Sequence, residues 1–226
     1  ALVGGIVGSV IAAGDFALIK WTGFWTIAAV LVASPIIGMA AGAFIQKILV
    51  FLTRGCTPRV NHVFKRSQLF TSIALALSHG GNDAQKSMGI ITMVLVANGV
   101  QKDFAIQLWV ILVCAAAMSI GTACGGWTII KTLGSKIYKL KPIHGFSAQA
   151  ASASVILTAG ILGGPVSTTH VVCSSIMGVG AAERIKAVKW FKAGEIVATW
   201  FITIPASALI AGGTYLCMNL IKSSLE

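Results

Sequence analysis

Long apolar stretches separated by short polar segments set the pattern of this 226-residue chain. A helix needs about 20 apolar residues to cross the hydrocarbon core of a bilayer. Four stretches reach that length, and we expect each to form a transmembrane helix: 22–52, 69–97, 104–130 and 193–221. A further apolar segment, 145–182, is interrupted near its middle by glycine, proline and hydroxyl residues. The pattern predicts an all-α polytopic membrane protein.

Composition agrees with this prediction. Hydrophobic residues make up 56% of the chain and charged residues 10%, with a mean hydropathy of +0.88. Soluble domains carry about 25% charged residues. The net charge of +11 would suit a nucleic-acid partner, but most of the Lys and Arg residues are confined to three short loops. We therefore expect a lipid bilayer, and no nucleic acid, around this protein.

The three basic loops also predict an orientation, because short loops rich in Lys and Arg stay in the cytoplasm. If these loops lie on the cytoplasmic side of a plasma or inner membrane, the last helix runs outward and the C-terminus lies outside. Segment 145–182 has a basic loop on each side, so it should be a re-entrant hairpin that turns at Gly163-Gly164-Pro165. The loop residues are Arg54, Arg59, Lys65 and Arg66; Lys131, Lys136, Lys139 and Lys141; and Arg184, Lys186, Lys189 and Lys192.

An internal similarity appears at an offset of 170 residues. Its matched residues include Gly8, Pro35 and Gly42 with Gly178, Pro205 and Gly212. The matched helices are predicted to run in opposite directions, which is the inverted-repeat plan of secondary transporters. We expect 1–52 to be the remainder of an N-terminal repeat, 53–67 a basic cytoplasmic linker, and 68–226 a C-terminal repeat. The alternative is chance similarity between helices rich in small residues.

A polar stretch interrupts the second expected helix. Asp83 and Lys86 lie in it, and ionisable groups at bilayer depth are costly unless they line a cavity or a pathway. Gly80-Gly81 precede them and predict a broken helix. Unwound backbone carbonyls, together with Asn82 and Asp83, would suit a hard cation such as sodium.

The same stretch could also hold an anion. Gln85 and Lys86 would begin the second half-helix, whose positive end favours negative charge. The alternative is that Asp83 and Lys86, three residues apart on one helix face, simply pair. For His79, a packing or hydrogen-bonding role and a proton-relay role both remain open.

A second polar cluster follows the predicted hairpin turn. Ser167, Thr168 and Thr169 should open the outgoing half of the hairpin. Their hydroxyls and the free N–H groups of a helix N-terminus suit a tetrahedral oxyanion. The alternative is that Ser167 is an ordinary N-cap. His170 would either orient the hydroxyls or fill the turn.

These residues carry a resemblance to a known family. The run from His79 to Ile90 resembles the second signature of the inorganic phosphate transporter (PiT) family, and Gly145 to Ala148 with Gly164 to His170 resembles its second hairpin motif. The resemblance extends over essentially the whole chain. It implies a phosphate symporter coupled to sodium or protons, built from two inverted repeats. By position, it assigns phosphate binding to Asn82, Gln85, Lys86, Ser167, Thr168 and Thr169, and cation binding to Asn82, Asp83, Ser167 and Thr168.

The chain departs from the family pattern in three ways. Gln149 stands where many members carry Glu, which leaves sodium or proton coupling open. Glu195, near the start of the last helix, has either a coupling role or a solvated position at the cytoplasmic end. The first repeat's motifs are absent, so we expect this chain to present half of a binding site and to need a missing N-terminal repeat. Homo-oligomers are compatible with this plan.

Other functions remain as alternatives. A sulfate transporter on the same scaffold shares the tetrahedral anion, and a passive anion channel or a non-transporting membrane scaffold represents a different class. Enzyme function is not expected, because the sequence has no nucleophile and base pattern, nucleotide loop or metal-ligand spacing. No organic cofactor is expected either.

Overall fold

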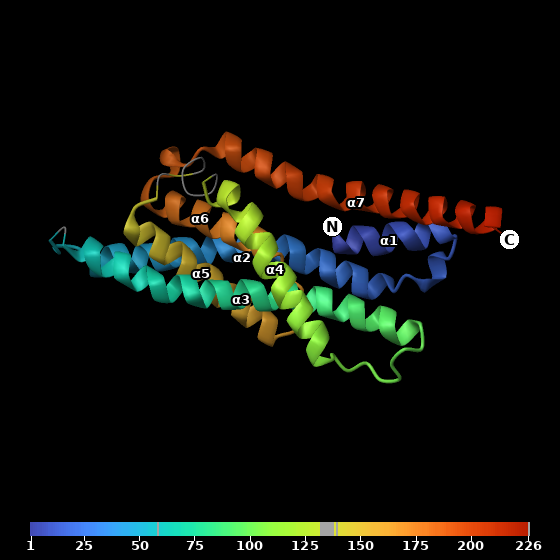
Figure 1. Ribbon diagram of the computed structural model, residues 1–226. Helices are drawn as coiled ribbons and strands as arrows, with labels where there is room; N and C mark the ends of the chain where they lie inside the picture. Colours follow the sequence, from blue (N-terminus) through green and yellow to red (C-terminus); the bar gives the residue numbers. More distant parts are fainter. Residues whose placement is uncertain (58, 132–137, 139, 226) are drawn as a thin grey trace. The chain divides into compact units, whose positions relative to one another are not determined.

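The computed structural model describes residues 1–57, 59–131, 138 and 140–225, and its regular elements in these ranges are all helical (Figure 1). Two compact units divide the chain. One comprises Ala1–Val30 and Trp190–Glu226, and the other comprises Leu31–Lys189. Two of the basic loop residues, Lys136 and Lys139, lie outside the described residues.

Three helices in the described ranges contain segments long and apolar enough to cross a membrane: Trp21–Leu52, Leu108–Trp127 and Trp190–Ser223. They lie in α2 (Trp21–Leu52), α4 (Leu108–Lys131) and α7 (Trp190–Leu225). Three of the four expected spans are therefore helices of sufficient length and apolar character, and their crossing of a membrane stays a prediction. The helix α3 (Val60–Ala97) does not qualify because its polar stretch lowers its hydropathy, so a membrane crossing by α3 stays a prediction.

The expected start of α4 at residue 104 is wrong, because the helix begins at Leu108. The preceding loop is held by Gln101, whose Nε2 donates hydrogen bonds to the carbonyls of Asp103 and Ala105 at 2.6 and 2.5 Å. Residues 101–107 therefore form a loop with local hydrogen bonds of its own before the helix.

The unit formed by the chain ends is built on small residues. It contains α1 (Leu2–Ala13), the 3-10 turn η1 (Phe16–Leu18), the first part of α2, and α7. A Cβ atom at Gly8 would collide with the backbone of Ala208, and one at Gly4 would collide with Ser207. Glycines therefore allow α1 and α7 to approach backbone to backbone, as in many membrane helix pairs.

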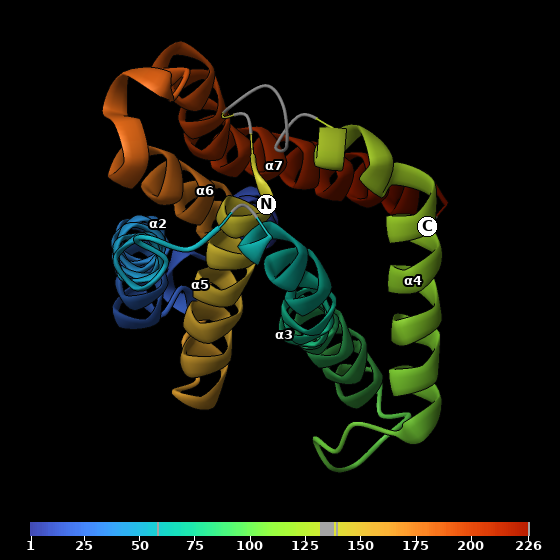
Figure 2. The ribbon, with the colours of Figure 1, turned by 90° about the vertical axis from the view of Figure 1, so that its left-hand side faces the viewer.

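The larger unit contains the rest of α2, α3, α4, α5 (Pro142–Ile161), α6 (Thr168–Arg184) and the turn η3 (Ile185–Ala187). Figure 2 shows α5 between α2 and α3. Helices α5 and α6 are joined by a turn in which Gly163 has φ of +69°, a conformation that favours glycine. The predicted hairpin turn is thus confirmed in position, whereas its re-entry into a membrane stays a prediction.

Close contacts also join α2 to α5 and α6. A Cβ atom at Gly178 would collide with the backbone of Met39, and Ser175 donates a hydrogen bond to the Gly38 carbonyl at 3.1 Å. Ser147 of α5 donates to Gln46 Oε1 at 2.6 Å, and both side chains are buried. The interior of this unit therefore contains polar contacts between its helices.

The predicted break at Gly80-Gly81 is wrong, because α3 is one continuous helix of 38 residues. Glycine weakens a helix interior by about 1 kcal/mol relative to Ala, but it keeps its N–H group. Proline disrupts a helix interior far more strongly, and α3 contains none. The helix therefore supplies no unwound carbonyls at this point, and Gln85 and Lys86 do not begin a new half-helix.

A polar cluster that sequence reasoning missed ties the start of α5 to the end of α6. His144 is 1% exposed, accepts the backbone N–H of Lys141 at its Nδ1 atom, and pairs with Glu183 through Nε2. Tyr138 also donates to Glu183, at 3.3 Å. Burial raises the pKa of Glu183, but the charges of His144 and Lys141 outweigh it and hold that pKa below 4.5. For Tyr138, burial and the Glu183 charge raise the pKa above 10.0.

Candidate functional site

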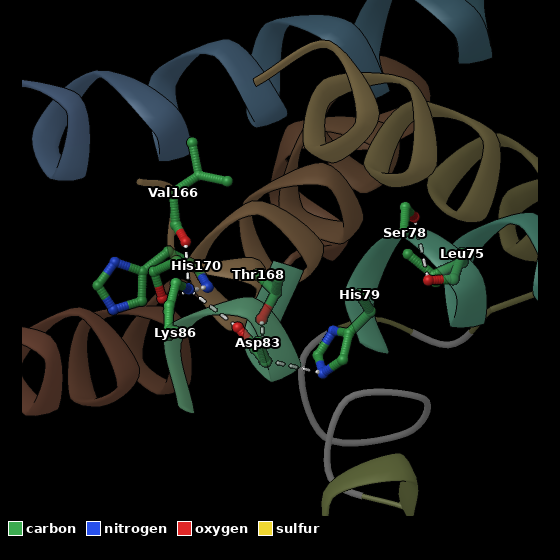
Figure 3. A network of polar contacts seen from close by, with 9 residues as sticks. Leu75, Ser78, His79, Asp83, Lys86, Val166, Thr168 and His170 are labelled. Atoms are coloured by element: carbon green, nitrogen blue, oxygen red, sulfur yellow. Dashed lines mark hydrogen bonds and ion pairs between the residues drawn. The ribbon is translucent and has the colours of Figure 1, made fainter. Parts of the chain in front are cut away.

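The centre of the candidate site is Asp83, which joins α3 to the start of α6 (Figure 3). One carboxylate oxygen, Oδ1, accepts a hydrogen bond from Lys86 Nζ at 2.9 Å. The other, Oδ2, accepts one from Thr168 Oγ1 at 2.9 Å and lies 3.4 Å from His79 Nε2. The structure thus brings both predicted polar clusters together, although 85 residues separate Asp83 from Thr168 in the sequence.

Lys86 connects α3 to the hairpin turn. Its Nζ atom donates to the Val166 carbonyl at 2.9 Å in addition to its bond with Asp83. The simple Asp83–Lys86 pair that was an alternative at the sequence level is therefore present, but both of its members also hold the hairpin. Hydrogen bonds to charged groups are stronger than neutral ones, so this junction fixes the hairpin tip against α3.

A small pocket adjoins Lys86, with a volume of ≈ 230 Å³. Its lining residues are Asn82, Gln85 and Lys86 from α3 with Gly160, Gly163, Gly164 and Pro165 from the hairpin. Drug-sized ligands occupy pockets of about 300–1,000 Å³, so this volume suits a smaller ligand such as an inorganic ion. Within the described part of the chain, the buried Asn82 Oδ1 atom has no hydrogen-bond partner, although buried polar atoms normally have one.

The three hydroxyl residues at the hairpin tip differ in their contacts and in their exposure. Ser167 is the N-cap of α6 and accepts the His170 N–H at 3.5 Å, in agreement with the capping alternative. Thr168 is buried, whereas Thr169 is exposed and does not join the Asp83 cluster.

Two further predicted residues lie away from this cluster. Gln149 of α5 accepts a hydrogen bond from Thr71 at 2.7 Å, about three helical turns along α3 from Asp83. Glu195 belongs to the other unit, where it is exposed and pairs with Lys192 at 2.7 Å. This pairing agrees with the solvated alternative for Glu195.

The Val166 carbonyl is a site atom that sequence reasoning missed. No residue type marks a backbone acceptor in a sequence, since every residue carries one. The position could be found only from the fold, which places this carbonyl opposite Lys86.

Comparison with known proteins gives consistent matches. Residues 53–211 match the phosphate transporter family PHO4. The probable low-affinity inorganic phosphate transporters of Rhizobium meliloti and Bacillus subtilis are each 43% identical over 223 residues, which is 98% of this chain and 67% of each relative. The corresponding protein of Mycobacterium tuberculosis is 38% identical over 95% of this chain and 52% of its own length.

A solved structure described as the sodium-dependent phosphate transporter has the same fold, with a TM-score of 0.65 and 27% identity. The alignment covers 97% of this chain and 65% of that one. The chain therefore spans between half and two thirds of the length of these relatives. The matches confirm the resemblance and, with the apolar helices, identify a membrane protein. They also confirm that the chain is not an enzyme, since the relatives are named as transporters.

Proposed function

Because the chain belongs to the phosphate transporter family, we propose that the protein carries inorganic phosphate across the cell membrane together with a coupling cation. The observation that carries the proposal is the meeting of Asp83 with Thr168. It brings a charged helix segment to a hairpin tip beside a pocket of ≈ 230 Å³. Ionisable groups at bilayer depth are costly, so a partly buried charge cluster of this kind has no role in a simple membrane scaffold.

Phosphate would occupy the pocket beside Lys86. The Lys86 ammonium supplies positive charge, and the Gln85 side chain and the Asn82 amide group supply further donors on the same lining. The exposed Thr169 and the N-terminus of α6 lie at the next position along the hairpin. Donors of this kind suit an anion whose oxygens accept hydrogen bonds on all sides.

The cation would bind at Asp83. The Asn82 Oδ1 atom and the hydroxyl oxygens of Ser167 and Thr168 are the other candidate ligands. A set made only of oxygen atoms favours a hard cation such as sodium over a transition metal. Protonation of Asp83 is the second form of coupling, and the solved relative described as sodium-dependent supports sodium.

The two sites share their donors, which gives a mechanism for coupling. Asp83 accepts hydrogen bonds from both Lys86 and Thr168. A cation on the carboxylate would compensate its charge and release these donors toward phosphate. It would also remove the repulsion between Asp83 and the phosphate oxygens. Each ion would therefore bind better when the other is present, as linkage requires.

We further propose that the chain is built on inverted repeats and works by alternating access, with the basic loops in the cytoplasm. The small-residue contacts support the repeat. Gly8 packs on Ala208 in one unit, and Gly178 packs on Met39 in the other. At the offset of 170 residues, Gly8 corresponds to Gly178. The residue that corresponds to Met39 at the same offset directly follows Ala208 in the sequence. The same type of helix contact thus occurs once in each unit. The close-packed glycine comes from the N-terminal half of the chain in one unit and from the C-terminal half in the other.

Uptake by the purified whole protein in proteoliposomes tests the proposal. We expect labelled phosphate to accumulate under an inward sodium gradient or an inward proton gradient, and the more effective gradient identifies the cation. Excess sulfate should compete poorly. Equal competition by sulfate would favour a sulfate transporter, and uptake that never exceeds equilibrium under either gradient would indicate a channel.

A further inference from the structure

The first turns of α3 carry a face that is basic at one end and apolar at the other. His62, Arg66, Leu69 and Ile73 follow one another at helical spacing of three or four residues, so they form a single stripe. Lys65 flanks the basic end. The stripe therefore changes from charged to apolar over about two helical turns.

The opposite face of the same turns packs against α5. Phe64 is 8% exposed and its ring lies 5.5 Å from the ring of Phe146. Gln68 donates to the Pro142 carbonyl at 2.7 Å. Because these contacts fix the rotation of α3, its basic and apolar stripe points away from α5.

An open pocket of ≈ 590 Å³ overlaps this stripe and is lined by His62, Lys65, Arg66, Leu69 and Phe70. Leu69 is 63% exposed and Phe70 is 73% exposed. Among the described residues, neither Lys65 nor Arg66 forms an ion pair with a carboxylate. The pocket thus combines uncompensated positive charge with exposed apolar surface, and neither the transport site nor the packing of α3 uses it.

We propose that this pocket binds the headgroup of an anionic phospholipid. Lys65 and Arg66 would contact the phosphodiester, and the acyl chains would lie along Leu69, Phe70 and Ile73. Basic residues at the end of a membrane-facing helix attract anionic lipids in this way, and their long side chains reach the headgroup level. Free inorganic phosphate would leave the apolar half of the pocket without a partner. The inference does not depend on the proposed transport function.

Native mass spectrometry of the whole protein in detergent provides the test, with dioleoyl phosphatidylglycerol as the anionic probe and dioleoyl phosphatidylcholine as the zwitterionic one. We expect tighter binding of phosphatidylglycerol, unaffected by equimolar inorganic phosphate. The double substitution Lys65→Gln with Arg66→Gln should weaken it about thirty-fold, since each basic residue near a lipid surface contributes about 1 kcal/mol.

A matched control removes two charges from another basic loop, with Lys186→Gln and Lys189→Gln, both exposed. The proposal requires this variant to retain phosphatidylglycerol like the wild type. Equal losses in both variants, equal binding of the two lipids, or displacement by inorganic phosphate would overturn it. If the Lys65 and Arg66 variant does not fold, hydrogen exchange of the wild type decides: phosphatidylglycerol nanodiscs should protect residues 59–70 more than phosphatidylcholine nanodiscs, and equal protection would overturn the proposal.

Discussion

Replacing Asp83 by Asn separates the two roles that the proposed mechanism gives to this side chain. The substitution keeps the size of the group and an oxygen that can accept the Thr168 hydroxyl, which donates to Asp83 at 2.9 Å. It removes the negative charge that would bind the cation and repel phosphate. We therefore expect phosphate binding to become independent of the cation.

The size of the effect follows from the geometry. Phosphate bound beside Lys86 would lie about 5 Å from the Asp83 carboxylate, since Lys86 Nζ is itself 2.9 Å from it. At an effective dielectric constant of about 20, two unit charges at this distance interact by about 3 kcal/mol. This corresponds to a change in affinity on the order of a hundredfold. In the absence of the cation, Asp83→Asn should therefore bind phosphate about a hundred times more tightly than the wild type.

Equilibrium binding of labelled phosphate to the purified whole protein, in sodium and in choline at one pH, measures this difference. The variant should bind phosphate equally in both salts, and uptake driven by the cation gradient should be lost. Asp103→Asn, which removes an acid from the exposed loop before α4, is the matched control and should behave like the wild type. Persistence of the wild-type cation dependence in Asp83→Asn would refute the mechanism.

Three further changes test other parts of the account. Thr168→Val removes a hydroxyl oxygen that would bind the cation, a loss of about 1–3 kcal/mol, so the half-saturating cation concentration should rise at least about fivefold, and more than in the exposed Thr169→Val. Gly178→Ala forces a methyl group into a neighbouring backbone and should lower stability by about 1–3 kcal/mol in detergent, whereas Gly121→Ala, with open space around it, should not lower it. Because the pKa of Glu183 is held below 4.5 in the folded protein, its stabilising effect should be present near neutral pH and disappear as the pH falls through the folded-state pKa. The difference in thermal midpoint between wild type and Glu183→Gln should therefore shrink on acidification; a constant difference would contradict this assignment.

The sequence was sufficient to predict the helical class, three of the long apolar helices and the hairpin turn, because each depends on local features. Apolar length decides the spans, and Gly163 with Pro165 decides the turn. The expected helix break failed because glycine only weakens a helix, and because α3 also packs against α5, which lies far away in the sequence. Propensity alone could not weigh those contacts.

The sequence predicted which residues belong to the candidate site, but not how they are arranged in space. Asp83 and Thr168 could be chosen because polar groups in apolar surroundings are costly. Their direct hydrogen bond, the bond from Lys86 to the Val166 carbonyl, and the different exposure of Thr169 depend on how α6 meets α3. The pair of the buried His144 with Glu183 was missed for the same reason, since its members are distant in the sequence.

The central claim is that phosphate binds in the pocket between α3 and the hairpin turn. Cryo-electron microscopy of the whole protein with phosphate and sodium tests it most directly. The account predicts phosphate density within hydrogen-bonding distance of Lys86 Nζ, against the lining formed by Asn82, Gln85 and Gly163 to Pro165. Phosphate density at another location, with Lys86 still bonded to both Asp83 and Val166, would contradict it.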